Sequence, residues 1–216
     1  MSDGNSFDVS TPQALELGIG TGRVAIPLAL KGVDVTGIDS SSLMLKKLHA
    51  KKSPAVVTTL LDDMTEYHEH LKSFNLVYCV FNTITCLARQ EDQLQLFINA
   101  SKYLHRGGYF TIQADVPDPA YLQLREWVKI HSVNSYGVEM LLCQHDPIRQ
   151  LIDYQFVSYR EDKVQLFPAR QRYVWAAEFD AMAAAANLRL VEREADWDGA
   201  PFKPTSQQHV SVYQKI

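Results

Sequence analysis

The chain has 216 residues, 46% of them hydrophobic and 21% charged, which suits one globular domain with a full core. Its formal net charge of −4 gives no electrostatic basis for binding nucleic acid. Three widely spaced cysteines, no apolar run of membrane-spanning length and no signal peptide exclude a disulfide scaffold and a membrane protein, and predict a soluble, cytoplasmic protein.

The first half of the chain alternates strand and helix patterns. Strands that alternate with helices at this rhythm predict a parallel sheet with helices on both faces. Serines 40–42 can cap the second helix, and Gly107 and Gly108 are expected to end the third. The expected strands cover residues 14–17, 33–39, 55–61, 75–81 and 109–113, and the first helix covers residues 21–30.

The pattern changes after the fifth strand. A helix is predicted to begin at Asp118 and Pro119 and to continue to Trp127. Three strand-like runs joined by short turns then predict an antiparallel meander, and we expect this insertion, residues 136–172, to lie over the mouth of the sheet. The runs cover residues 138–144, 151–159 and 164–170, with turns at 145–147 and 160–162; a helix carrying Phe179 and Met182 follows, ended by Asn187, with last strands at 188–193 and 209–214.

The turn between the first strand and the first helix carries three glycines, Gly18, Gly20 and Gly22, spaced by single residues. Such a turn brings backbone N–H groups and a helix N-terminus close to a ligand, and a Cβ would block the approach. The dinucleotide fingerprint G-x-G-x-x-G is not met, because Arg23 stands where the third glycine would fall when the motif is counted from Gly18. An acid before the turn, Glu16, favours a ligand with a cationic amine over a pyrophosphate.

Three further strands end in residues suited to such a ligand. In a parallel α/β sheet, ligands bind beyond the carboxyl ends of the strands. The second strand ends in Asp39, whose carboxylate can accept both hydroxyls of a ribose, the third in residues 62–64, Asp-Asp-Met, and the fourth in residues 81–83, Phe-Asn-Thr. Each has a plainer interpretation beside it: Asp39 could cap the next helix, and the acids at 62 and 63 could lie in a solvated loop.

Together these residues resemble the class I S-adenosylmethionine-dependent methyltransferases, over a stretch from about Ala14 to Ile216. The resemblance implies an α/β fold, a Rossmann-like three-layer sandwich whose mostly parallel seven-stranded sheet has an antiparallel last strand, with the β insertion over the active-site mouth. It also implies that S-adenosyl-L-methionine is the cofactor. By position, cofactor-binding roles would fall to Glu16, Gly18, Gly20, Gly22, Asp39, Ser40, Asp63, Met64, Phe81 and Asn82.

The resemblance implies transfer of a methyl group to an N or O atom of a small-molecule acceptor. No catalytic residue is assigned, although Asp115 and His145 are titratable residues that we expect near the mouth. Members that methylate the exocyclic amines of bases carry an Asn/Asp-Pro-Pro-aromatic run, and Phe81-Asn82-Thr83-Ile84 lacks it. No nucleic-acid or membrane partner is therefore expected, and no metal, since residues 68–70 (His-Glu-His) fit a solvated helix face better. A homodimer is possible.

Other interpretations stay open. The chain could be a non-catalytic or truncated S-adenosylmethionine-binding protein of the same fold, or a nicotinamide oxidoreductase. Related enzymes have a helical leader before the first strand, and here residues 1–12 are expected to be disordered or a truncated leader. A truncated chain, a partner chain that supplies the cover, or lost catalysis would each account for so short a leader.

Overall fold

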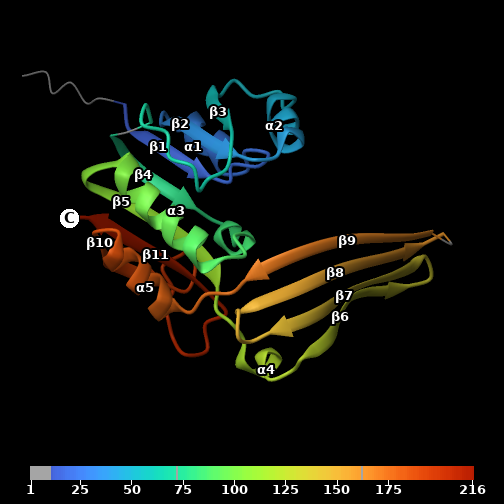
Figure 1. Cartoon of the computed structure of the whole chain (residues 1–216). Coiled ribbons are helices and arrows are strands. Elements are labelled where there is room, and N and C mark those ends of the chain that lie inside the picture. Colours follow the sequence, from blue (N-terminus) through green and yellow to red (C-terminus); the bar gives the residue numbers. More distant parts are fainter. Residues whose placement is uncertain (1–10, 72, 162) are drawn as a thin grey trace, which may run out of the picture.

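The larger of two sheets forms the body of the molecule (Figure 1). The computed structural model describes residues 11–71, 73–161 and 163–216. The seven strands are ordered β10-β11-β5-β4-β1-β2-β3, and β11 is antiparallel to both its neighbours while the other pairs are parallel. The predicted Rossmann-like sheet with a reversed last strand is confirmed. The bounds are β1 Gln13–Leu17, β2 Asp34–Asp39, β3 Val57–Leu61, β4 Phe74–Cys79, β5 Leu104–Asp115, β10 Leu188–Glu194 and β11 Gln208–Lys215.

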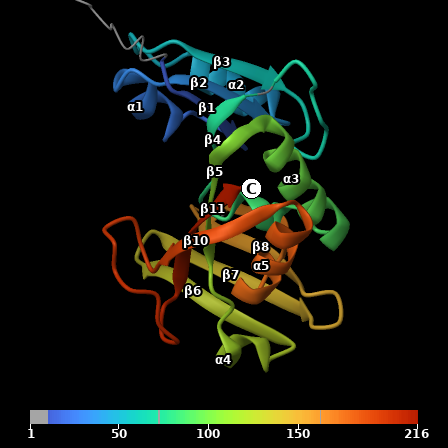
Figure 2. The same ribbon diagram turned by 90° about the vertical axis from the view of Figure 1, so that its left-hand side faces the viewer.

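Helices cover both faces of this sheet, as Figure 2 shows for α1 and α3. Alternate residues of β1 point to opposite sides, so Ala14 belongs to the apolar cluster under α1 while Leu15 and Leu17 belong to the larger core. That core holds Phe97 and Phe179 of the helices on the other face. The helices are α1 Ala25–Leu30, α2 Ser42–His49, α3 Gln90–Tyr103 and α5 Ala176–Ala185, with a 3₁₀ helix, η1, at Thr83–Cys86.

The ends of the elements shift by a few residues from the sequence prediction. The first helix begins at Ala25 instead of residue 21, so Pro27 lies in its first turn, where the missing N–H has no helical partner to lose. Asn187 has a positive φ of 57° and follows α5, as predicted. The expectation for residues 1–12 falls mainly on residues 1–10, which lie outside the described residues.

The second sheet corrects the sequence prediction in two places. It has four antiparallel strands, β6-β7-β8-β9, instead of three. The predicted helix through Trp127 is wrong, because α4 ends at Leu122 and Trp127 pairs with Cys143 on β7. The turn predicted at residues 145–147 begins two residues later, at residue 147, because the pairing of Asp146 with Leu151 extends β7 past His145. The bounds are α4 Pro119–Leu122, β6 Glu126–Asn134, β7 Gly137–Asp146, β8 Leu151–Arg160 and β9 Lys163–Arg172.

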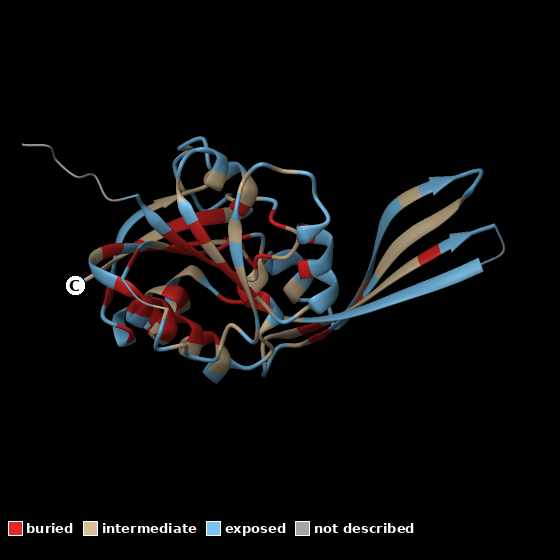
Figure 3. Cartoon of the chain, turned by 90° about the horizontal axis from the view of Figure 1, so that it is seen from above, coloured by how far each residue is buried: buried red, intermediate tan, exposed pale blue. Residues whose placement is uncertain are grey.

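A buried arginine joins the base of the second sheet to the body. Arg172 is 4% exposed, and its guanidinium donates to Glu178 Oε1 at 2.7 Å and to Gln93 Oε1 at 2.5 Å. It also donates to Gln150 Oε1 at 3.0 Å, in the turn before β8. From this base the sheet projects away from the body (Figures 1 and 3).

Among the described residues, no helix combines the length and the apolar character needed to span a bilayer.

Candidate functional site

The glycine turn after β1 has the backbone geometry that its spacing predicts. Gly18, Gly20 and Gly22 all have positive φ, between 54° and 79°. A Cβ on Gly18 would lie 2.3 Å from Thr83 Cγ2, whereas a Cβ on Gly20 would meet no atom within 4 Å. Packing against Thr83 therefore excludes a side chain at Gly18. Gly20 instead faces open space, which leaves its backbone accessible to a ligand. This is the fit that a cofactor lying over the turn requires.

Asp39, at the end of β2, holds the turn from one side. Its carboxylate accepts from the backbone N–H of Gly20 at 2.7 Å and from that of Ser41 at 2.8 Å. A carboxylate has about four lone pairs, so two acceptor positions are left for a ligand's hydroxyls. Ser41, not its exposed neighbour Ser40, is the N-cap of α2, and its Oγ accepts from Met44. The plainer interpretation of Asp39 as a helix cap is therefore not what the structure shows.

Glu16 lies beneath the turn instead of facing a ligand. It is 3% exposed and its Oε2 accepts from the Tyr78 hydroxyl at 3.0 Å. Burial raises its pKa from 4.5 to about 7; Tyr78 and the Ala25 N–H act in the opposite direction, and Asp39 adds to the rise. The sequence did not reveal Tyr78, because nothing local marks a tyrosine 62 residues away as the partner of this acid.

The end of β3 lies beside the end of β2. The backbone N–H of Asp62 donates to the Asp39 carbonyl at 3.1 Å. Asp63 Oδ1 accepts from the N–H and the hydroxyl of Thr65, at 2.8 and 2.7 Å, which fixes the loop as a turn. Met64 is partly buried and packs against the main core. The loop thus presents the predicted acid and apolar pair next to Asp39.

The end of β4 is strained and fastened to β5. Phe81 and Asn82 have φ of 56° and 60°, and such backbone costs about 1–2 kcal/mol per residue other than glycine. Asn82 donates to Asp115 Oδ2 and accepts from the Asp115 N–H, both at 2.6 Å. Gln113 Oε1 accepts from the Phe81 N–H at 3.2 Å. The Arg23 guanidinium lies over the exposed Phe81 ring, 4.7 Å from the ring centre.

A cavity of about 1060 Å³, the mouth cavity, opens beside Asn82 and Asp115. One wall is the loop after β5, and another is the second sheet, so the insertion does border the mouth. Two charged side chains that the sequence prediction did not nominate, Asp118 and Lys129, also line it. Its aromatic residues are Tyr121, Trp127, Tyr154 and Tyr173.

The structure separates the two titratable residues that the sequence placed near the mouth. Asp115 lines the cavity, but His145 is 5% exposed and is not among the lining residues. Its Nε2 lies 3.1 Å from the hydroxyl of Tyr173, which does line the cavity. Within the described residues, no group of three or more His, Cys, Asp or Glu side chains could hold a metal ion.

Comparisons with known proteins identify the family. A model described as "Methyltransferase domain" matches residues 14–108. The structure of the CcbJ methyltransferase from Streptomyces caelestis is 35% identical, with a TM-score of 0.87 over 96% of this chain and 90% of that one. The S-adenosylmethionine-bound amino pentose methyltransferase CalS10 from Micromonospora echinaspora is 16% identical, with a TM-score of 0.72 over 96% of this chain and 84% of that one.

A putative methyltransferase of Bacillus subtilis, YqeM, is 28% identical over an alignment of 141 residues, which covers 61% of this chain. The match spans only 57% of the length of that curated relative. The family model, the CcbJ likeness over nearly the whole chain and the sheet order agree with one another. The chain belongs to the class I methyltransferases, whose cofactor is S-adenosylmethionine.

Proposed function

We propose that this protein transfers a methyl group from S-adenosylmethionine to an amine nitrogen of a small molecule held in the mouth cavity. The observation that carries the proposal is the position of Asp115, in the wall of a cavity of about 1060 Å³ that begins where β4 and β5 end. A hydrogen-bonded carboxylate there favours an amine, which becomes cationic as it accepts a methyl group. The similarity to CalS10, an amino pentose methyltransferase, is consistent with this choice.

When bound, S-adenosylmethionine supplies an electrophilic methyl group on a sulfonium. In our proposal the glycine turn, Gly18 to Gly22, lies under its methionine part, and Asp39 accepts the ribose hydroxyls. Asp63 and Met64 contact the adenine. The other predicted cofactor-binding residues act less directly. Glu16 supports the turn from below, and Ser40 lies beside the ribose. Phe81 and Asn82 border the methionine chain.

On the acceptor side, Asp115 accepts a hydrogen bond from the amine and stabilises the charge that develops on it. Asn82 holds this carboxylate through two hydrogen bonds of 2.6 Å and is therefore a positioning residue. The aromatic wall excludes water, and its ring faces suit a cationic nitrogen. A neutral amine needs no strong general base, so alignment supplies most of the rate enhancement.

Calorimetry tests the cofactor part. S-adenosylmethionine and S-adenosylhomocysteine should bind, and Asp39→Ala should weaken both by at least about tenfold, because ordered acceptors for the ribose are lost. Asp34→Ala is the matched control, since Asp34 is exposed at the opposite end of the same strand. Heat on titration with NAD alone would refute the assignment and favour an oxidoreductase.

Methyl incorporation into a panel of small amines, alcohols and oligonucleotides tests the acceptor part. Amines should be methylated, and Asp115→Asn should raise the KM for the amine by about tenfold while cofactor affinity stays unchanged. Activity confined to alcohols or nucleic acid would exclude an amine acceptor. Cofactor binding without turnover on any acceptor would leave a non-catalytic binding protein.

A further inference from the structure

The second sheet has one face that lines the mouth cavity and one that points away from it, which we call the outer face. Residues that pair side by side across the four strands form rows, and beyond the base of the sheet the outer face has three of them. No residue in these rows carries a charge. The rows are Val128, Leu142, Gln155 and Pro168; Ile130, Met140, Val157 and Leu166; and Val133, Val138, Tyr159 and Val164.

These apolar side chains are exposed to a degree unusual for a monomer. Ile130 is 65% exposed, Val133 66% and Leu166 59%. Together the apolar residues of the three rows expose roughly 700 Å², more than the 300–600 Å² of the largest apolar patch on a typical monomer. Figure 3 shows the projecting sheet as mostly exposed or half-buried. The inner face differs, since it carries Lys129, Glu139 and Arg160.

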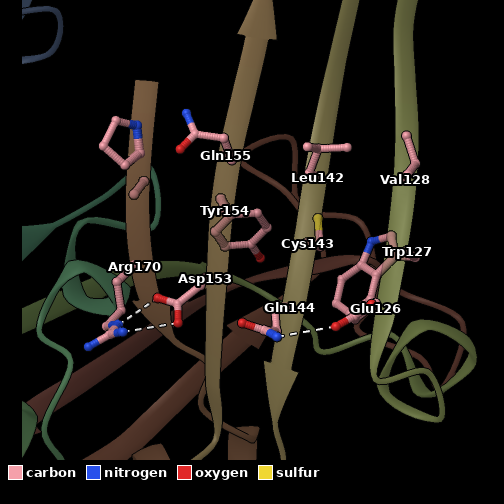
Figure 4. A pocket seen from close by; sticks show the side chains of 12 residues that line it. Glu126, Trp127, Val128, Leu142, Cys143, Gln144, Asp153, Tyr154, Gln155 and Arg170 are labelled. Carbon is pink, nitrogen blue, oxygen red and sulfur yellow. Dashed lines mark hydrogen bonds and ion pairs between the residues drawn. The ribbon is translucent and has the colours of Figure 1, made fainter. Parts of the chain in front are cut away.

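The outer face is also hollowed near its base. Figure 4 shows this hollow, of about 860 Å³, whose described lining residues all belong to β6 to β9. Its base row is polar but already paired: Arg170 Nε donates to Asp153 Oδ1 at 2.6 Å, and Gln144 donates to Glu126 at 3.2 Å. A partner that covers the hollow therefore meets Asp153 with its counter-charge in place and Glu126 with an amide donor.

We infer that the outer face is the contact surface of a homodimer, in which it packs against the same face of a second copy. Two stacked sheets need matching twist and complementary apolar faces about 10 Å apart, and an identical sheet related by a two-fold axis has both. The exposed apolar area of roughly 700 Å² is close to the ~800 Å² per partner of a standard interface. A charged partner is disfavoured because the three rows offer no counter-charge.

The row order sets the geometry of this dimer. We place the two-fold axis along the middle row, near the cross-strand pair Met140 and Val157, so that this row packs against the same row of the second copy. The tip row, with Val133 and Val164, then lies over the row beside the hollow, with Val128. The apolar tip of each copy fills the hollow of the other. This inference does not depend on the proposed methylation activity.

Sedimentation of the full chain tests the surface. Wild-type protein should be dimeric at about 10 µM, and Leu166→Lys should weaken association by at least about tenfold, because each dimer would bury two ammonium groups. Ile148→Lys is the matched control: Ile148 is 93% exposed but lies in the turn between β7 and β8, outside the outer face. A monomeric wild type, or equal loss in both variants, would overturn the inference. So would binding of the monomer to phosphatidylcholine vesicles through this face.

A thiol cross-link tests the geometry. In a background that replaces the exposed Cys86 by serine, Met140→Cys should react with a short bifunctional thiol reagent to give covalent dimers. Val133→Cys should not cross-link to itself but should cross-link to Val128→Cys when the two are mixed. Thermal unfolding of each variant checks that it is folded. Efficient Val133 self-cross-linking without a Met140 product would refute the two-fold arrangement.

Discussion

Replacing Glu16 by glutamine probes the electrostatics under the glycine turn. The folded protein keeps this carboxyl protonated up to about pH 7, while the unfolded chain ionises it near 4.5. The protonated form thus contributes stability that is fully present below pH 4.5 and is lost as the pH rises through 7. At about 1.36 kcal/mol per pKa unit, the loss is about 3 kcal/mol. Glutamine stays neutral at every pH and avoids that loss.

Urea unfolding of wild type and Glu16→Gln, in the same buffers across this pH range, measures the effect. The free energies of unfolding of the two proteins must be compared at each pH, because the titration of His209 changes stability with pH in the opposite direction. Burial lowers the His209 pKa from 6.5 to about 4, so its contribution is present above 6.5 and is lost as the pH falls towards 4. Subtracting the wild-type free energy of unfolding from that of the variant cancels this second group.

The difference should grow in favour of glutamine by about 3 kcal/mol between pH 4.5 and pH 8. Glu192→Gln removes one carboxylate at an exposed position and is the matched control. A difference that does not change with pH would refute the reasoning, because it would mean that Glu16 has the same pKa in the folded and the unfolded protein.

Two further predictions concern the turn and the base of the second sheet. Gly18→Ala should cost about 2–4 kcal/mol in urea unfolding, because it adds backbone strain and a clash with Thr83, whereas Gly20→Ala should cost only about 1 kcal/mol. Calorimetry should nevertheless show weaker cofactor binding for Gly20→Ala, and full affinity would contradict an approach over that residue. Arg172→Met should lower the free energy of unfolding by about 3–5 kcal/mol, since it removes the hydrogen bonds of a buried guanidinium and leaves the half-buried Glu178 carboxylate without its counter-charge. Arg170→Met, at an exposed pair, should cost less than about 1 kcal/mol, and similar losses in both would contradict this reasoning.

The seven-stranded sheet and the backbone of the candidate site were predictable because their signals are local. Glycine spacing, the acid that ends β2 and the alternation of strand and helix each depend on residues close in sequence. The fourth strand of the second sheet was not predictable in this way. The segment around Trp127 follows a good helix start at Asp118, and only pairing with β7, more than ten residues later, makes it extended.

Side-chain partners in the site were also beyond prediction. The Asn82 and Asp115 pair joins residues 33 apart, and no local pattern connects them. His145 was misplaced because His-Asp-Pro favours a turn by local criteria, whereas strand pairing keeps the residue in β7 and buries it. The sequence therefore predicts which residues reach the carboxyl edge, while the fold decides which of them meet.

Four residues that form one row across the second sheet line both the mouth cavity and the outer hollow: Trp127, Cys143, Tyr154 and Ala169. The two spaces are thus separated by the thickness of a single sheet. If the mouth cavity binds the acceptor and the outer face forms the dimer, a substitution in this row alters acceptor binding and self-association at once. The cofactor edge, formed by β1 to β4, contributes nothing to that row. Divergence in acceptor choice among proteins of this architecture should therefore be accompanied by changes in assembly, while the methyl-donor site is retained.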